Sequence, residues 1–397
     1  MTTGPLGQIA HTNQEHLVDS SSDSNKYWAS GETLRDNSAA QAHARTRCFS
    51  RHGNRHGGSY HFFYWTSNTQ PGSLANILTR ATLFGWLGVN LFFVLSGFLI
   101  TGILMDTKAK PGFFRNFYMR RVRRIIPAYA LCIALLLILG IISMGGLLRA
   151  VTFTANYGFI PAHKSYGPFW SLSVEEQFYL FWPLLVFFTR RTYLTIICIG
   201  ICIAEPALRY LAVLHGHHVG AVHEATFLIA DSLALGALGA IFFRSRYATR
   251  KNALAFAGAL TLGGAVLLIY GVPHGLLHRV NPLGAAFQAE PFDMFFAAAM
   301  FGSLAIQSPF FSGAITRPFR FLGDISYGLY LYHLIAFTLY DSFFRRASYY
   351  GHFGAEVVRA VVSISVAIAF AWVSRWYYEE RFLRKRPATK QQQTATV

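Results

Sequence analysis

The chain has 397 residues, of which 53% are hydrophobic, 16% aromatic and only 13% charged. Soluble domains carry about 25% charged residues, so this composition disfavours a soluble globular protein. The formal net charge is +17, which in a soluble protein would suggest binding to nucleic acid. In a membrane protein the same excess comes from loops that face the cytoplasm. We therefore predict an integral membrane protein in a lipid bilayer, with no nucleic-acid partner.

The two ends of the chain differ from its middle. The first 60 residues contain no apolar run long enough to cross a membrane and are rich in Ser, Asn, His, Arg and Gly, a composition typical of disordered segments. The last apolar run ends near residue 378, and a basic tail follows. The sequence thus predicts a polar segment at 1–59, a membrane domain at 60–382 and a cytoplasmic tail at 383–397.

The middle of the chain predicts an all-α, polytopic bundle of membrane helices. A helix that crosses a bilayer needs about 20 mostly apolar residues, and the sequence contains nine such runs. They lie at about 81–105, 126–147, 173–189, 192–213, 225–243, 252–272, 291–307, 325–342 and 355–378.

The connections between these runs alternate in charge. One set, which includes 106–125, 244–251 and the C-terminal tail, contains 20 Lys and Arg, whereas the other set contains 5. By the positive-inside rule the first set faces the cytoplasm, and so does the C-terminus. The four cysteines form no CxxC pair, so neither a metal site nor a disulfide framework is predicted.

Four segments have polar or small residues where a membrane helix is normally apolar or ends. They are Gly88–Ile100 (GVNLFFVLSGFLI), Phe117–Tyr129 (FYMRRVRRIIPAY), Trp170–Leu180 (WSLSVEEQFYL) and Ile325–His333 (ISYGLYLYH). In the first segment, Ser96 and Gly97 interrupt a Phe and Leu run. Small residues let two membrane helices approach closely, so we expect a tight helix contact there.

In this order and spacing, the four motifs resemble the integral-membrane acyltransferase-3 family. Members of that family O-acylate sugars of surface polysaccharides, lipopolysaccharide, peptidoglycan and some small glycosides. The resemblance runs from about residue 84 to residue 382, where Tyr378–Phe382 looks like the family's closing signature. It implies ten core helices, one more than the apolar runs, in what we expect to be the inner membrane of a bacterium.

The resemblance also implies an enzymatic reaction. It predicts transfer of an acyl group, expected to be acetyl, from cytoplasmic acyl-CoA to a carbohydrate hydroxyl at the outer face. Two alternatives stay open: a polysaccharide export or assembly protein, and a catalytically dead family member. An acyltransferase should bring His61, Arg121, Arg124 and Glu175 or Glu176 around one cavity, whereas a transporter should line a continuous path with its polar groups.

His61 resembles the catalytic base of the family's first helix, because Phe62–Trp65 looks like the sequence that follows that histidine. In the family an Arg and ten intervening residues precede the histidine, but Ser50 stands at that position, in a polar stretch. Back-translation of residues 44–59, read one base later with free wobble positions, permits PALDAFRGMAIVMAVL. This peptide is an apolar helix with an Arg in place of Ser50. We therefore hypothesise that the chain is frame-shifted before Tyr60.

The motifs suggest further site residues. Acyl transfer to an alcohol needs a base, for which imidazole is suited, and donors for the oxyanion. Arg120, Arg121 and Arg124 are candidates for binding the phosphates of acyl-CoA, since guanidinium groups suit bidentate phosphate contacts. Arg121 and Arg124, three residues apart, share one helix face. The alternative is simple anchoring at the cytoplasmic surface.

Glu175 and Glu176 are candidate catalytic carboxylates at the outer start of a span, where a buried acid is costly unless functional. They could instead stabilise a helix N-terminus. Gln177 and Tyr179 are candidates for acceptor-sugar binding. Trp170 could stack on a sugar, although an interfacial aromatic belt would explain it equally well.

The fourth motif contributes Ser326, Tyr327 and His333 as candidate substrate-binding residues. A histidine inside a span is a functional candidate, with a structural histidine as the alternative. Four more charged residues in or near spans are expected to make paired contacts at an outward cavity: Glu205, Arg209, Asp231 and Arg359.

Overall fold

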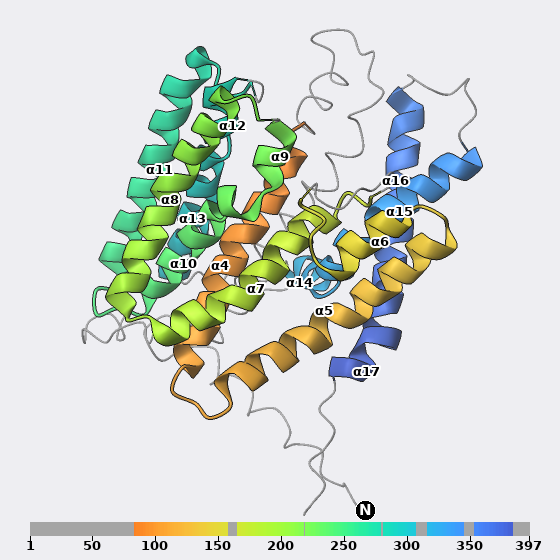
Figure 1. The fold of residues 1–397 in the computed structure, drawn as a ribbon, viewed down its shortest axis with the longest axis horizontal. Coiled ribbons are helices and arrows are strands. Elements are labelled where there is room, and N and C mark those ends of the chain that lie inside the picture. The colour runs from red at the N-terminus through yellow and green to blue at the C-terminus, as the bar shows by residue number, and fades with distance from the viewer. Residues whose placement is uncertain are drawn as a thin grey trace, which may run out of the picture.

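A computed structural model describes residues 83–157, 165–217, 219–278, 281–306, 316–344 and 353–383. Across these ranges the chain is helical and contains no β-strand (Figure 1). The predicted all-α class is therefore confirmed for the described residues. The polar segment 1–59 and the predicted base His61 lie outside them.

Within the described ranges, nine helices of 13 residues or more each overlap one of the nine apolar runs, although the second of them ends at residue 138 and not at the predicted 147. They are α4 (Leu87–Thr107), α5 (Phe113–Ile138), α7 (Phe169–Phe188), α8 (Arg191–Leu214), α10 (Asp231–Phe243), α11 (Arg250–Gly271), α13 (Glu290–Ile306), α15 (Ser326–Phe344) and α16 (Phe353–Val373). The short elements are η1 (Leu83–Trp86), α6 (Met144–Val151), α9 (Val219–Glu224), η2 (Thr226–Leu228), η3 (Val272–His274), α12 (Pro282–Phe287), α14 (Arg317–Asp324), η7 (Ser374–Glu379) and α17 (Glu380–Leu383).

Five helical segments are long and apolar enough to cross a membrane, judged by length and composition. They are Leu87–Thr107, Arg191–Leu214, Arg250–His274, Pro282–Ile306 and Gly354–Leu383. These helices identify an integral membrane protein, whereas the number of nine spans stays a prediction.

Two helices begin earlier than the apolar runs indicate, which corrects two expectations. Helix α5 begins at Phe113, after Gly112 in the left-handed region with a φ of 71°. The arginines of the second motif therefore lie within a helix rather than in the predicted connection 106–125. Helix α7 begins at Phe169, so Glu175 and Glu176 lie beyond its first turn. Since the helix dipole acts mainly within the first turn, it does not account for them.

Helix α4 lies inside the bundle, in contact with α7, α10 and α13 (Figure 1). Its most apolar window is 72% buried, against 22% for α8 and α11. A Cβ on Gly97 would lie 1.9 Å from the Leu233 carbonyl oxygen, and one on Gly236 2.0 Å from that of Val94. The close helix approach predicted at Gly97 is therefore confirmed, with α10 as the partner.

The ends of four helices are joined at one end of the bundle by basic side chains. Lys108 Nζ donates to the Thr189 carbonyl at 2.9 Å, linking the ends of α4 and α7. Arg191 Nη1, at the start of α8, donates to the Arg244 carbonyl at 2.7 Å. Arg244 in turn forms a 2.6 Å ion pair with Asp106 of α4. The structure thus gathers connections from the strongly basic set at one end, which we call the basic end; its cytoplasmic orientation stays a prediction.

Candidate functional site

A buried carboxylate lies where α4 and α7 meet. Ser96 Oγ donates to Glu175 Oε1 at 2.6 Å, and the Tyr179 hydroxyl donates to the same oxygen at 3.3 Å. The two hydroxyl oxygens lie 3.2 Å apart. Glu175 is only 4% exposed, and Tyr179 reaches it because residues four apart are neighbours on a helix. Two hydroxyl partners thus offset the cost of burying this acid.

Arg121 of α5 lies against this network. Its guanidinium carbon is 5.0 Å from the centre of the Tyr179 ring, within cation–π range. Its charge acts on both Glu175 and Glu176. Glu176 is half-buried, interacts electrostatically with Tyr327 of α15, and accepts no hydrogen bond from the described part of the chain. One cation therefore faces two carboxylates of different environments.

The three candidate arginines of α5 separate into two groups. Arg124, which is exposed, lies one turn beyond Arg121, and the charges of Arg121, Arg375 and Glu379 act on it. Arg120 is exposed and makes no hydrogen bond or ion pair within the described ranges. The structure thus brings Arg121 and Arg124 together and leaves Arg120 outside the group.

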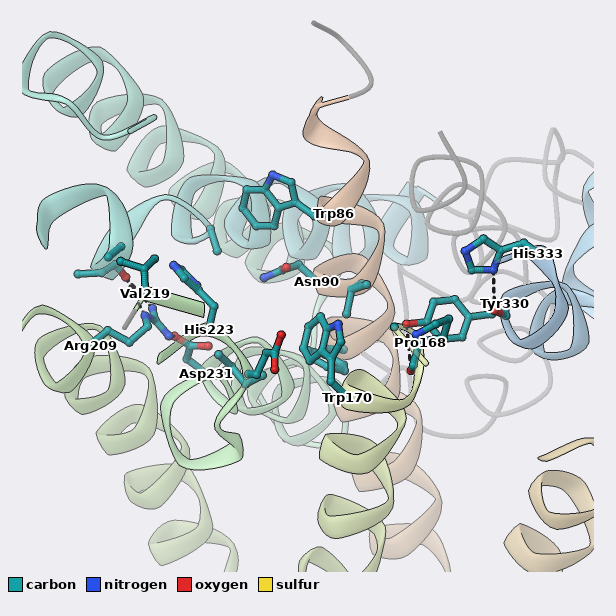
Figure 2. A pocket seen from close by; sticks show the side chains of 18 residues that line it. Trp86, Asn90, Pro168, Trp170, Arg209, Val219, His223, Asp231, Tyr330 and His333 are labelled. Atoms are coloured by element: carbon teal, nitrogen blue, oxygen red, sulfur yellow. Dashed lines mark hydrogen bonds and ion pairs between the residues drawn. The ribbon is translucent and has the colours of Figure 1, made fainter. Parts of the chain in front are cut away.

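A cavity of about 330 Å³ opens at the bundle end opposite the basic end (Figure 2). Aromatic and polar side chains in its wall are Trp86, Asn90, Trp170, Arg209, His223, Glu224, Asp231, Tyr330 and His333. Trp170 meets Phe93 edge to face, with ring centres 6.4 Å apart. His333 is buried in α15, and its Nδ1 lies 2.7 Å from the Tyr330 carbonyl oxygen. The predicted residues Trp170 and His333 thus share this cavity, which we call the outer cavity because it lies opposite the basic end.

A smaller hollow of about 20 Å³ lies between the outer cavity and Glu175. It shares Val89, Phe93 and Tyr330 with the cavity and is also lined by Glu175, Ser171, Ser326 and Tyr327. Such a volume is about that of a single water molecule. Two of its lining residues, Ser326 and Tyr327, were predicted from the sequence. The Ser326 hydroxyl donates to the Gly323 carbonyl at 2.8 Å, and the Tyr327 hydroxyl donates to the Ile125 carbonyl at 3.3 Å. Only this small hollow therefore separates Glu175 from the outer cavity.

Gln177 lies apart from the other predicted residues. Its Nε2 donates to the Phe153 carbonyl at 2.7 Å and to Asn156 Oδ1 at 3.1 Å. Its Oε1 accepts from Thr226 Oγ1 at 2.5 Å. The amide thus joins α7 to the chain near residue 155 and to η2, which gives Gln177 a structural role in this arrangement.

A buried cluster of charges forms another wall of the outer cavity. Arg209 Nη1 donates to Asp231 Oδ2 at 2.7 Å, and its Nη2 pairs with Glu290. Glu205 Oε2 accepts from the Asp231 amide at 2.7 Å. The paired contacts expected of Arg209 and Asp231 are therefore confirmed. Arg359 instead pairs with Asp341, at 2.6 Å, away from the residues that line the cavity.

Sequence reasoning missed three residues beside this cluster. Asn90 Nδ2 donates to Ser232 Oγ and to Asp293 Oδ2, each at 3.2 Å, and Ser232 Oγ donates to Asp293 at 2.7 Å. Asp293 could have been found from the sequence, because it is an acid within an apolar run and intramembrane acids rarely lack a partner or a role.

Comparison with known proteins decides the family. A family model described as an acyltransferase domain matches residues 56–376, most of the chain. The chain belongs to the acyltransferase-3 family. The resemblance drawn from the four motifs is thereby confirmed.

Named relatives of this acyltransferase-3 protein include the peptidoglycan O-acetyltransferase OatA of Listeria monocytogenes, which is 29% identical over 64% of this chain and 45% of its own length. The putative peptidoglycan O-acetyltransferase YrhL of Bacillus subtilis is 28% identical over 63% of this chain and 44% of its own length. A putative O-acetyltransferase of Staphylococcus aureus is 25% identical over 76% of this chain and 53% of its own length. The chain spans about half the length of these relatives. No solved structure matches it.

All four motifs of this acyltransferase-3 protein meet around one carboxylate. Ser96 comes from the first motif, Arg121 from the second, Glu175 and Tyr179 from the third, and Tyr327 from the fourth. Chemically, this arrangement offers a fixed carboxylate that accepts hydrogen bonds, a guanidinium group that attracts an anion, and a nearby cavity lined by aromatic rings.

Proposed function

We propose that this protein is a membrane O-acyltransferase. It takes an acyl group, acetyl by analogy with its named relatives, from acyl-CoA at the basic end and transfers it to a carbohydrate hydroxyl at the opposite, outward face. The observation that carries this proposal is that Arg121 packs over the ring of Tyr179, whose hydroxyl donates to Glu175 next to the outer cavity.

The donor would bind through Arg121 and Arg124. Both belong to α5, which starts at the basic end and passes Tyr179. Neither makes an ion pair with a described acidic residue, so their N–H groups are available for the phosphates of coenzyme A. Arg120, on the outside of the same helix, would contribute at most to the attraction of an anion toward this end.

The acceptor would enter the outer cavity. Trp86, Trp170 and Tyr330 offer flat apolar surfaces for a sugar ring, and Asn90 and His333 offer polar contacts. At about 330 Å³ the cavity is at the small end of ligand pockets, so it suits part of a carbohydrate polymer. The names of two relatives make a peptidoglycan-type carbohydrate the first acceptor to test.

The reaction joins the acceptor oxygen to the acyl carbon and breaks the thioester carbon–sulfur bond. His61 would take the hydroxyl proton as general base, and coenzyme A would leave as its thiol after protonation of the sulfur. Glu175, held by Ser96 and Tyr179, would orient the hydroxyl or the imidazole, with Glu176 on the Arg121 side. N–H donors at the site would stabilise the developing oxyanion.

The test measures transfer of radiolabelled acetyl groups from acetyl-CoA to peptidoglycan in membranes that contain the protein. We expect Glu175→Gln and Arg121→Gln each to reduce transfer by about a hundredfold or more, a typical effect of losing a catalytic group. Glu356→Gln, a buried acid paired with Arg359 away from the site, is the matched control. Undiminished transfer by Glu175→Gln would remove this carboxylate from the reaction. Polymer export without acetylation would support the transport alternative.

A further inference from the structure

The last long helix changes its winding beside α5. After α16, residues Ser374–Glu379 form a π-helical turn, η7, and α17 follows. Both η7 and α17 contact α5, and Figure 1 shows α17 below α5. π-helical turns are rare and occur frequently at functional sites.

Buried hydrogen bonds fix the turn against its neighbours. Glu379 is 5% exposed and accepts from Ser374 Oγ at 2.9 Å. Ser374 Oγ lies 3.0 Å from the hydroxyl of Tyr332, which donates to the Ala128 carbonyl of α5 at 3.2 Å. The turn is thus held to α15 and α5 by groups in the interior.

The turn, which contacts α5, carries a third guanidinium group, that of Arg375. The charges of Arg375 and Arg121 both act on Arg124, and Glu379 is the acid that partly offsets them. Arg375 Nη1 pairs with Glu380 Oε2 at 2.7 Å, while its Nε is buried and has no hydrogen-bond partner in the described chain. Like charges repel, so three guanidinium groups close together are unfavourable unless an anion lies between them.

The acids near this cluster leave some of its guanidinium N–H groups without a partner in the described chain. Glu379 is already bonded to Ser374, and Glu380 pairs with one nitrogen of Arg375. Glu175 and Glu176 interact electrostatically with Arg121. An N–H of Arg375 and the guanidinium groups of Arg121 and Arg124 are therefore left for an additional anion.

We infer that Arg375 completes a phosphate-binding site with Arg121 and Arg124, and that Glu380 is its counter-ion when no phosphate is bound. Planar guanidinium groups bind phosphate oxygens in pairs, which a cluster of three can extend over more than one phosphate. The phosphate could belong to coenzyme A or to an anionic lipid headgroup. Naming coenzyme A as the source rests on the proposed function, whereas the phosphate site itself does not.

The experiment measures binding to the full chain, so it does not require an active enzyme. The protein is placed in nanodiscs of zwitterionic phosphatidylcholine, and the Kd of coenzyme A is measured by calorimetry. A charged hydrogen bond contributes about 1.5–3 kcal/mol, so Arg375→Gln should raise the Kd about tenfold to a hundredfold. Arg375→Lys should give a smaller increase, because it keeps the charge and loses the planar fork. Glu380→Gln should lower the Kd, since it removes the competing acid.

Controls separate the site from its surroundings. Arg246→Gln, at an exposed arginine stacked on Tyr247, should leave the Kd unchanged. Pantetheine, which has no phosphate, should bind equally to the wild type and to Arg375→Gln. Unchanged elution and unfolding temperature establish that each variant is folded. If Arg375→Gln misfolds, Arg375→Lys and Glu380→Gln still give the two opposite shifts.

The outcomes distinguish the source of the phosphate. A weaker Kd for coenzyme A supports the site with the coenzyme as ligand. If coenzyme A does not bind but Arg375→Gln loses retention of phosphatidylglycerol from mixed nanodiscs, the phosphate site stands and the proposed donor fails. If Arg121→Gln weakens coenzyme A binding and the Arg375 and Glu380 variants do not, the inference is overturned while the proposed function stands. No effect of any variant on either ligand overturns the inference as well.

Discussion

Ser96 supplies the shorter of the two hydrogen bonds to the Glu175 carboxylate, 2.6 Å against 3.3 Å from Tyr179. Ser96→Ala should therefore shift the Glu175 carboxylate from its position while keeping the carboxylate itself. A hydrogen bond to a charged group contributes about 1.5–3 kcal/mol, so we expect a tenfold to hundredfold lower kcat for acetyl transfer. The KM for acetyl-CoA should change little, because the donor arginines lie on α5. Steady-state kinetics in membranes measures both.

Ser303→Ala provides the matched control for this change. Ser303 is equally buried, at 7% exposed, but its hydroxyl donates to the Met300 carbonyl within α13. It does not line the outer cavity or the hollow. An equal fall in kcat in both variants would mean that loss of a buried hydroxyl, and not the position of Glu175, limits the reaction.

Arg209 is the residue whose loss should most reduce stability. It is 3% exposed and pairs with Asp231 and Glu290, so Arg209→Gln leaves the buried Asp231 and the half-buried Glu290 without their cation. Breaking a buried ion pair in this way typically costs about 3–5 kcal/mol. We expect a correspondingly lower unfolding temperature in detergent. Arg359→Gln, whose pair with Asp341 is more exposed, should cost less; the opposite order would contradict this account.

At the scale of the helices, the contact of α4 with α10 depends on Gly97. A Cβ there would lie 1.9 Å from a backbone oxygen, which no side-chain rotation relieves. Gly97→Ala must therefore separate the two helices and should destabilise the protein by about 1–3 kcal/mol or more. Since Ser96 is next in the chain, transfer activity should fall as well. Thermal unfolding and the transfer assay check the two effects.

Gly258 of α11 is the matched control, because a Cβ there meets nothing within 4 Å. Ala is favoured over Gly within a helix by about 1 kcal/mol, so Gly258→Ala should be neutral or slightly stabilising. The same substitution is thus predicted to have opposite signs in the two helices. Destabilisation by both would show that helix propensity arguments fail here and that the α4–α10 contact is not special.

Apolar runs predicted where the helices lie but not where two of them begin. The first turns of α5 contain Arg115 and Asn116, so a hydropathy argument excludes them, although Phe113 and Phe117 of the same turns are buried. Helix periodicity likewise explains Gln177. It is adjacent to Glu176 in the sequence, but each residue turns the direction by about 100°, so its amide points to η2.

Across the whole molecule, the site depends on contacts that no local pattern contains. The partners of Asn90 lie 142 and 203 residues further along the chain. The third guanidinium of the proposed phosphate site comes from a turn near the C-terminal end of the described chain, more than 250 residues after Arg121. The resemblance to a family supplied the residue types at each motif, whereas only the fold shows which of them meet.

A frame shift before Tyr60 would explain why His61 follows a polar segment. The family match begins at residue 56, close to the proposed recovery at Tyr60, and the shifted reading of residues 44–59 is an apolar peptide leading to His61. In that reading the base is carried on a tenth membrane helix, which holds it at a fixed depth. In the sequence as written, the residues before His61 are polar and cannot provide such an anchor.

Restoring the frame should therefore raise acetyl transfer by about a hundredfold or more, the contribution typical of a positioned general base. The assay compares the sequence as written with the restored version, each with and without His61→Ala. His61→Ala should abolish the gain of the restored protein and lower the activity of the original by a smaller factor. Equal activity of both versions, or an intact gene frame together with full activity of the written chain, would refute the frame shift. A restored protein that is indifferent to His61→Ala would instead remove this histidine from the mechanism and leave the donor and acceptor sites as proposed.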